Sequence, residues 1–288
     1  MKTYSQTQRN YIAEGANQDT ILRRWARKSL GLEESRVTSK RHSALSGPPG
    51  VGKTYGIMEE IRNSGVKHIV IGPGSTEAAI AAKLAYGVNN LKKDEELIVV
   101  IDDADDVVFA DKATMNQWKL AFAKYDPIYA RDVDLTSTIR KYEKMGRQDL
   151  IDAITAFQEP GEIGIHIPMD RVRFIIICNT DLEDLKSFHS SKRTHVEALV
   201  DRLKYRKLDF EWKVNWGWLA YILSNSQPFA DVDIELDDEQ KARICSWMWD
   251  KWENMRNTSY RTVEEMAEYM IEEPDSYEDE WEKFLRTR

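Results

Sequence analysis

Short, continuous apolar runs recur along the first two-thirds of the chain. Two of them, Leu97–Ile101 and Phe174–Cys178, are too short for helices, and each ends at a polar residue. Such runs are typical of strands that are buried on both faces of a parallel sheet. Further strands are expected at residues 67–71 and, from Tyr205, at 205–210.

Segments with helical periodicity separate these runs. They lie at residues 21–30, 54–63, 113–124 and 137–157. A further, alanine-rich helix is expected between a cap at Ser75 and a stop at Gly87. Strands that alternate with helices predict an α/β fold in which a parallel sheet lies between helices.

The strand signal ends at about residue 233. Asp237 and Gln240 have the spacing of a capping box, and Ser259 begins a second helix. Most of the nine tryptophans fall in this last third, which predicts a small helical domain packed around aromatic side chains. We therefore expect three parts: an N-terminal helical segment with a connector (1–43), an α/β core (44–215) and a helical lid with an acidic C-terminal stretch (216–288).

The composition is that of a globular protein, with 42% hydrophobic and 31% charged residues in a chain of 288. No apolar run approaches the roughly 18 residues of a membrane span. The first residues, MKTYSQTQRN, lack the apolar stretch of a secretion signal. The two cysteines, Cys178 and Cys245, do not form a disulfide framework, and no Cys/His cluster has zinc spacing. A cytoplasmic protein without membrane contact is expected.

Charge is unevenly distributed around a net value of −8. Ten acidic and no basic residues lie between Glu264 and Glu282, whereas residues 1–46 carry nine basic and four acidic ones. The simple interpretation is a solvated acidic tail and a solvated basic helix face. The functional alternative is a basic patch that binds an anionic partner.

One octet combines glycines with a lysine and a hydroxyl side chain: Gly47, Pro48, Pro49, Gly50, Val51, Gly52, Lys53 and Thr54. It fits the pattern G-x-x-x-x-G-K-[ST] and is followed by a predicted helix. Glycines let the backbone point successive N–H groups at phosphate oxygens, and the helix start adds partial positive charge. Lys53 is expected to reach the β- and γ-phosphates of ATP, and the Thr54 hydroxyl to bind Mg²⁺.

Carboxylates for a metal and for an attacking water follow the first buried run. Asp102 is expected to hold Mg²⁺ through water, and Asp103 to orient or deprotonate the nucleophilic water. Asp105 and Asp106 are interpreted as caps for the segment that follows. Asn179, at the end of the second buried run, is expected to hydrogen-bond the γ-phosphate or the water.

In this order, the motifs resemble those of the AAA+ family of P-loop ATPases, over residues 43–210 and in part to about 270. The octet resembles the Walker A loop, Leu97–Asp103 resembles Walker B, and Phe174–Asn179 resembles the sensor-1 strand. The resemblance also gives roles to two arginines. Arg202 resembles the arginine finger, with Arg206 as a competitor, and Arg261 resembles sensor 2, which reaches the phosphates from the lid.

The resemblance implies an ATP hydrolase that binds Mg-ATP at the subunit interfaces of a homo-oligomeric ring or spiral. Such an enzyme would remodel or load a macromolecular partner, as in DNA replication or recombination. The basic N-terminal segment favours DNA or a DNA-bound protein over a protein client. A β-hairpin at residues 159–168, suggested by Gly161 and the alternating Ile163, Ile165 and Ile167, favours DNA as well, since some branches of the family insert a substrate-contacting hairpin before sensor 1. The alternative is a connector packed against the ATPase body.

Two features depart from the family pattern. The second Walker B acid is most often Glu, whereas here it is Asp103, and 76 residues separate Asp103 from Asn179. The shorter carboxylate suggests an alternative function, a nucleotide-gated binding module or loader with little or no hydrolysis. A P-loop kinase or GTPase is a third interpretation, but the chain lacks the Asn-Lys-x-Asp guanine motif.

Overall fold

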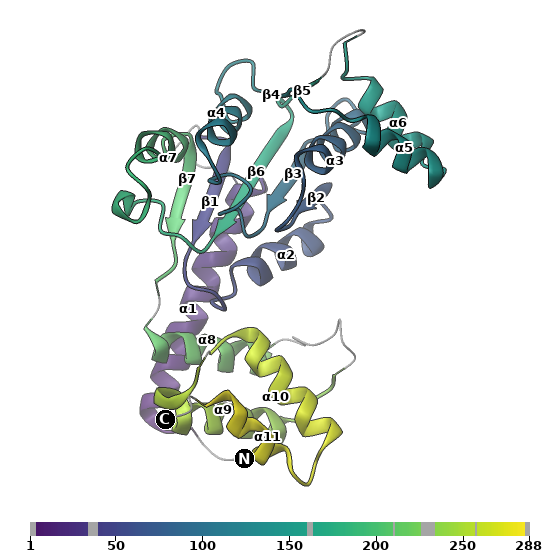
Figure 1. Ribbon diagram of the computed structural model, residues 1–288. Helices are drawn as coiled ribbons and strands as arrows, with labels where there is room; N and C mark the ends of the chain where they lie inside the picture. The colour runs from purple at the N-terminus through teal and green to yellow at the C-terminus, as the bar shows by residue number, and fades with distance from the viewer. Residues whose placement is uncertain are drawn as a thin grey trace. The chain divides into compact units, whose positions relative to one another are not determined.

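The computed structural model describes residues 4–33, 40–159, 164–209, 211–225, 234–256 and 258–285, and the chain forms two compact units (Figure 1). The sheet unit consists of Ala26–Gly47 and Ile57–Lys207. The helical unit consists of Met1–Trp25, Pro48–Gly56 and Leu208–Arg288. Both units are discontinuous in sequence, unlike the three consecutive parts expected above. The helical unit therefore contains most of the expected phosphate loop together with the C-terminal helices.

Five strands form one parallel sheet in the sheet unit, in the order β2-β3-β6-β1-β7. Their bounds are β1 His42–Ser46, β2 His68–Ile71, β3 Leu97–Ile101, β6 Val172–Cys178 and β7 Leu203–Lys207. This confirms the predicted α/β fold with a parallel sheet between helices. The register pairs Ser46 with Cys178, and Ile101 with Ile176, so the carboxyl ends of β1, β3 and β6 lie at one edge of the sheet.

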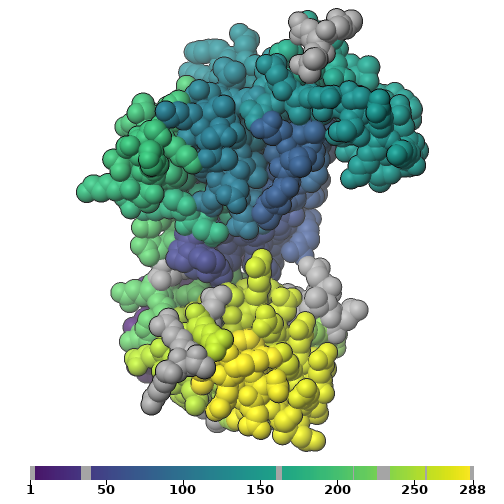
Figure 2. Space-filling view, in the orientation of Figure 1, coloured from purple at the N-terminus to yellow at the C-terminus, as the bar shows by residue number. Residues whose placement is uncertain are grey.

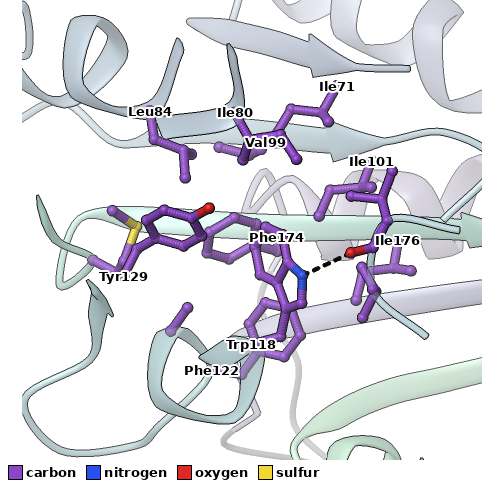
Figure 3. Packing of buried hydrophobic residues seen from close by; sticks show 14 of the residues in the cluster. Ile71, Ile80, Leu84, Val99, Ile101, Trp118, Phe122, Tyr129, Phe174 and Ile176 are labelled. Carbon is purple, nitrogen blue, oxygen red and sulfur yellow. Dashed lines mark hydrogen bonds between the residues drawn. The ribbon is translucent and has the colours of Figure 1, made fainter. Parts of the chain in front are cut away.

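Both faces of the sheet are buried, which explains why its strands are continuous apolar runs. One face packs with α3 (Glu77–Asn89), α4 (Lys112–Ala121) and α7 (Arg193–Val200) in a single hydrophobic core. Aromatic rings fill its centre (Figure 3), where the ring centroids of Trp118 and Phe174 are 5.6 Å apart. The Trp118 indole N–H donates to the Val107 carbonyl at 3.0 Å. The strand positions on the other face are buried too: Ser43, Leu45, Ile98, Val100, Ile175 and Ile177.

The alanine-rich helix α3 begins and ends at other residues than expected. Its N-cap is Thr76 rather than Ser75, because the Thr76 side chain accepts a hydrogen bond from the backbone N–H of Ala79. Gly87 lies inside the helix and does not end it. A Cβ at this position would come within 2.6 Å of a Leu97 methyl group, so glycine here permits close packing of α3 against β3.

An insertion separates α4 from β6. It contains the antiparallel strands β4 (Ile128–Arg131) and β5 (Ile165–Pro168) and, between them, the helices α5 (Thr136–Lys144) and α6 (Gln148–Thr155). Residues 165–168 form a strand, but its partner is β4 and not the preceding residues of the expected hairpin at 159–168, so that part of the prediction is wrong. Residues 160–163 lie outside the described part of the chain. The single helix expected at 137–157 is divided at Gly146, whose φ is 66°.

The helical unit packs around aromatic rings, among them Trp216, Trp218 and Trp281, each buried to 1% exposure or less. Its C-terminal helices are α8 (Trp212–Asn225), α9 (Asp238–Lys251), α10 (Tyr260–Glu272) and α11 (Tyr277–Trp281). The capping box expected at Asp237 and Gln240 is formed, and the helix expected to begin at Ser259 does so, also with a capping box. Two helices, α1 (Gln6–Ser29) and α2 (Lys53–Ser64), begin in this unit and continue along the chain into the sheet unit. The structure also contains the short 3₁₀ segments η1 (Leu185–Ser187), η3 (Trp252–Asn254) and η4 (Glu282–Phe284).

The first helix is longer than the expected segment at 21–30, because α1 already begins at Gln6. Its early turns cross α8 within the helical unit. A Cβ on Gly15 would come within 2.2 Å of the Trp218 backbone nitrogen, and one on Gly217 within 2.0 Å of the Tyr11 carbonyl oxygen. The two glycines therefore let the helix backbones touch, and glycine at position 15 serves this contact instead of ending a helix.

We predict that Phe174→Ala destabilises the sheet unit by about 3–5 kcal/mol, because it removes a fully buried ring from the aromatic centre of the core. Urea unfolding followed by far-UV circular dichroism measures the change. Leu120→Ala is the control, since Leu120 is 51% exposed on α4 and its truncation leaves no cavity. Equal losses for the two variants would contradict the assignment of Phe174 to the core.

Candidate functional site

The expected phosphate loop runs from the end of β1 into the first turn of α2. Gly50 and Gly52 have φ angles of 83° and 77°, in the left-handed region that favours glycine. Helix α2 begins at Lys53, directly after the second of these glycines. Left-handed residues before a helix start are the arrangement in which successive N–H groups form an anion-binding concavity.

Contacts within the helical unit hold this loop. A Cβ on Gly50 would lie 2.2 Å from the Ser259 Cβ, and one on Gly52 would lie 2.2 Å from the Trp218 ring. The loop thus packs directly on α8 and on the N-cap of α10, and glycine is required at both positions for conformation and for space. Lys53 is only 7% exposed, and its ammonium donates to the Pro48 carbonyl at 2.8 Å.

Tyr55, the residue after Thr54, extends the same contact. Its ring stacks on Tyr260 at 5.1 Å and meets Trp218 edge-on at 6.3 Å. No motif in the sequence indicates a role for Tyr55 or Trp218 at the loop, or a contact between them. Arg261, the sensor-2 candidate, is exposed in the first turn of α10, two positions after the Ser259 that touches Gly50.

In the sheet unit, the acids after β3 and the end of β6 come together. The side-chain amide of Asn179 donates to the Asp103 carboxylate at 3.2 Å. Asp103 has a φ of 50°, an uncommon backbone conformation for a residue other than glycine, and such conformations cluster at functional sites. Asp102 is partly buried directly after β3, and its backbone N–H donates to the Ile71 carbonyl of β2 at 2.9 Å.

Asp105 has a different role from the one expected. Its carboxylate accepts the backbone N–H groups of Asn179 at 2.9 Å and Thr180 at 3.2 Å. It therefore caps the end of β6, and not the segment that follows it in sequence. Because two backbone donors bind one carboxylate, Asp105 fixes the position of Asn179 relative to β3.

A hydroxyl network lies where β1 meets the loop. Tyr205 of β7 shares a 2.5 Å hydrogen bond with Ser46, the last residue of β1, and donates to Asp181 at 2.8 Å. Lys207 forms an ion pair with Asp181 at 3.1 Å. Burial raises the pKa of Tyr205 above its ordinary value. The network connects the start of the loop, through Ser46, to the edge strand of the sheet.

Arg202 directly precedes β7, so it lies at the amino ends of the strands, whereas Asp103 and Asn179 lie at the carboxyl ends. It donates to the Ala198 carbonyl of α7, and burial together with the Arg202 charge lowers the pKa of Lys119. Arg202 also lines an open cavity of about 880 Å³ at the amino ends of β1 and β7, with Arg41 and Tyr125 among the other residues.

The competing finger candidate, Arg206, belongs to β7 itself and pairs with Leu45 of β1. Burial lowers its pKa, and within the described residues its Nε atom is buried without a hydrogen-bond partner. A half-buried arginine in a strand that is paired with β1 is poorly placed to extend from the surface. The position of Arg206 within a strand therefore favours Arg202 over Arg206 as the finger candidate.

Among the described residues, no group of three or more His, Cys, Asp or Glu side chains is placed to hold a metal ion. In the expected site, Thr54 and Asp102 would hold Mg²⁺ together with the phosphates and water. Within the same described ranges, no helix is both long and apolar enough to cross a membrane.

Comparison of the chain with models of protein families gives no match, and comparison with curated proteins gives none either.

We predict that Asp105→Ala lowers the free energy of unfolding by about 1–3 kcal/mol, because it leaves two backbone N–H groups at the end of β6 without their acceptor. Asp106→Ala is the matched control, since Asp106 is exposed one position further along the chain. Urea denaturation of both variants measures the difference. A loss no larger for Asp105→Ala than for Asp106→Ala would contradict the capping role.

Proposed function

We propose that the chain is an ATPase of the AAA+ type that hydrolyses Mg-ATP and uses the energy to remodel or load a macromolecular partner. The observation that carries this proposal is the loop conformation. Gly50 and Gly52 adopt left-handed angles directly before a helix that begins at Lys53, and the octet follows β1 directly along the chain. A chance occurrence of the octet would not require this conformation.

The proposed nucleotide site divides its work among a few side chains. Lys53 binds the β- and γ-phosphates, and Thr54 and Asp102 share one Mg²⁺. The metal, when bound, would offset the negative charge that develops on the transferred phosphoryl group. Loop N–H groups and the start of α2 bind the remaining phosphate oxygens.

Asp103 and Asn179 would act on the attacking water. Their 3.2 Å hydrogen bond keeps the amide beside the carboxylate, and Asp105 holds the backbone of Asn179 in place. The carboxylate orients the water and accepts its proton, while the amide hydrogen-bonds the water or the γ-phosphate. Both side chains are exposed, which leaves their polar atoms accessible to water and nucleotide.

Arg202 would complete the site of a second copy of the chain. Arg202 and the pair Asp103 and Asn179 lie at opposite ends of the strands. A strand of five residues, the length of β1 and β7, spans about 16 Å. Because of this separation, Arg202 is too distant to reach the γ-phosphate of its own site. We therefore propose a homo-oligomer in which Arg202 stabilises transition-state charge in trans, so that hydrolysis depends on assembly.

The contact of Ser259 with Gly50 supports a sensor-2 role for Arg261, since it brings the start of α10 to the phosphate loop. Phosphate contacts made by Arg261 would change on hydrolysis, and α10 would move with them. The proposed partner is DNA or a DNA-bound protein, in replication or recombination.

A second candidate function is a nucleotide-gated binding module with little hydrolysis. The motivation is Asp103, whose carboxylate is one methylene shorter than Glu and is engaged by Asn179. Steady-state ATP turnover separates the two functions. Turnover of many ATP molecules per chain excludes the binding module, whereas tight ATP binding without turnover, with and without DNA, excludes the hydrolase.

We predict that Lys53→Ala abolishes ATP binding, because it removes the cation for the β- and γ-phosphates. Titration with a fluorescent ATP analogue measures the affinity. Lys83→Ala is the control: Lys83 is an exposed lysine of α3 that bonds the Val70 carbonyl of the sheet unit. Undiminished nucleotide affinity in the Lys53 variant would sink the proposed function.

We predict that Arg202→Ala leaves ATP binding intact and slows turnover on the order of 10³-fold, as expected for loss of an arginine finger. Arg206→Ala should retain most of its turnover. A mixing experiment tests the role in trans: Lys53→Ala chains keep the finger, and Arg202→Ala chains keep the nucleotide site. Activity should reappear when the two inactive variants are mixed; a mixture that stays inactive argues against a shared site.

A further inference from the structure

Helix α5 carries a stripe of cations on its exposed side. Arg140, Lys141 and Lys144 follow Ser137 at spacings of three, four and seven residues, which places the four side chains on one face of the helix. All four residues are exposed. We refer to Arg140, Lys141 and Lys144 as the α5 stripe.

Packing fixes the direction in which this stripe points. Leu135, just before the helix, is buried at 1% exposure, and Ile139 and Tyr142 pack against the core of the sheet unit. These residues form the opposite face of α5. The helix therefore cannot turn its cations inward, and the stripe lies on the outer side of the insertion, whose helices are coloured teal in Figure 2.

The stripe differs in its ion pairing from two basic residues of α1, Arg23 and Arg27. Arg23 is paired with Asp19 at 2.6 Å, and Arg27 with Glu33 at 2.8 Å. Among the described residues, by contrast, no acidic side chain lies within ion-pair distance of the α5 stripe. Its three charges are thus concentrated on about one helical turn of a chain whose net charge is −8.

We propose that the α5 stripe binds the phosphate backbone of a nucleic acid. Glu143 lies on the same helix, and Asp134, just before it, is close enough for the charge of Arg140 to act on its carboxylate, but neither forms an ion pair with the stripe. Exposed cations that form no ion pair release counterions when they meet phosphates, which is the main source of sequence-independent affinity for nucleic acids. Lysine and arginine side chains on adjacent positions of a helix reach successive phosphates along a strand. This inference rests on the proposed function in one respect only, that it names DNA as the partner class.

Other partners fit the stripe less well. A stable protein interface needs a desolvated apolar centre, and a membrane-bound helix needs an exposed apolar face. The apolar face of α5 is turned into the core, and the large exposed apolar side chain nearest the stripe is Met145, which is 58% exposed. A surface composed of cations and a hydroxyl suits regularly spaced phosphates.

The test compares two triple variants with the same change in charge. The stripe variant is Arg140→Gln/Lys141→Gln/Lys144→Gln, and the control is Lys92→Gln/Lys93→Gln/Lys186→Gln, which removes three exposed lysines elsewhere on the sheet unit. Glutamine keeps helix propensity, and circular dichroism verifies the fold of each variant. Fluorescence anisotropy with labelled single-stranded and duplex 30-mers measures affinity across a series of salt concentrations.

The unmodified chain should bind at least one of the two DNAs, with an affinity that falls steeply with salt. The stripe variant should lose about 10-fold or more in affinity and reduce the slope of log K against log salt by about 2–3, while the control changes little. Absence of DNA binding by the unmodified chain, equal losses in both triple variants, or equally strong competition by polyglutamate would overturn the proposal. DNA binding is measured without nucleotide, so Lys53→Ala should bind DNA normally even where the proposed ATPase function fails.

Discussion

Parallel pairing of β1, β3 and β6 is the constraint on which the candidate site depends. Because the strands run in one direction and are buried on both faces, their carboxyl ends share an edge. Polar residues that immediately follow apolar strands must then emerge at that edge, where they meet one another. The hydrogen bonds from Asn179 to Asp103 and Asp105 are the direct result of this geometry, although more than 70 residues separate the partners.

The phosphate loop is supported by a second set of interactions, those of the helical unit. Hydrogen atoms alone fit at Gly50 and Gly52 because Ser259 and Trp218 occupy the adjacent space. The loop conformation is therefore specified twice, by the backbone freedom of glycine and by the side chains packed on it. A loop held in this way has little freedom to reorganise independently of α8 and α10.

Much of the fold follows from the sequence, since long-range pairing leaves a local trace in the strands. The run Leu97–Ile101 is β3 as expected, and helices begin at the capping box of Asp237 and after Ser259, as expected. The pairing partner of a strand cannot be predicted where it lies far away in the sequence and leaves no local pattern. β5 pairs with β4, which lies more than 30 residues earlier, and nothing in 159–168 indicates that partner.

The candidate site shows the same division. Its glycine loop and its acids carry recognisable spacing, so they could be found from the sequence. Tyr205 could not, because it reaches Ser46 only through the register of β7 with β1. The expectation for Asp105 is wrong for a related reason: its backbone partners, Asn179 and Thr180, directly follow β6, and a cap that serves a distant strand has no local signature.

The crossing of α1 and α8 has an evolutionary consequence. Gly15 and Gly217 leave room for no side chain at all, and neither position belongs to a nucleotide-binding motif. Descendants of a common ancestor can exchange most surface residues without disturbing this crossing, but any methyl group at either glycine would force the two helices apart. Distant relatives of this chain with low sequence identity are therefore expected to keep both glycines, about 200 positions apart.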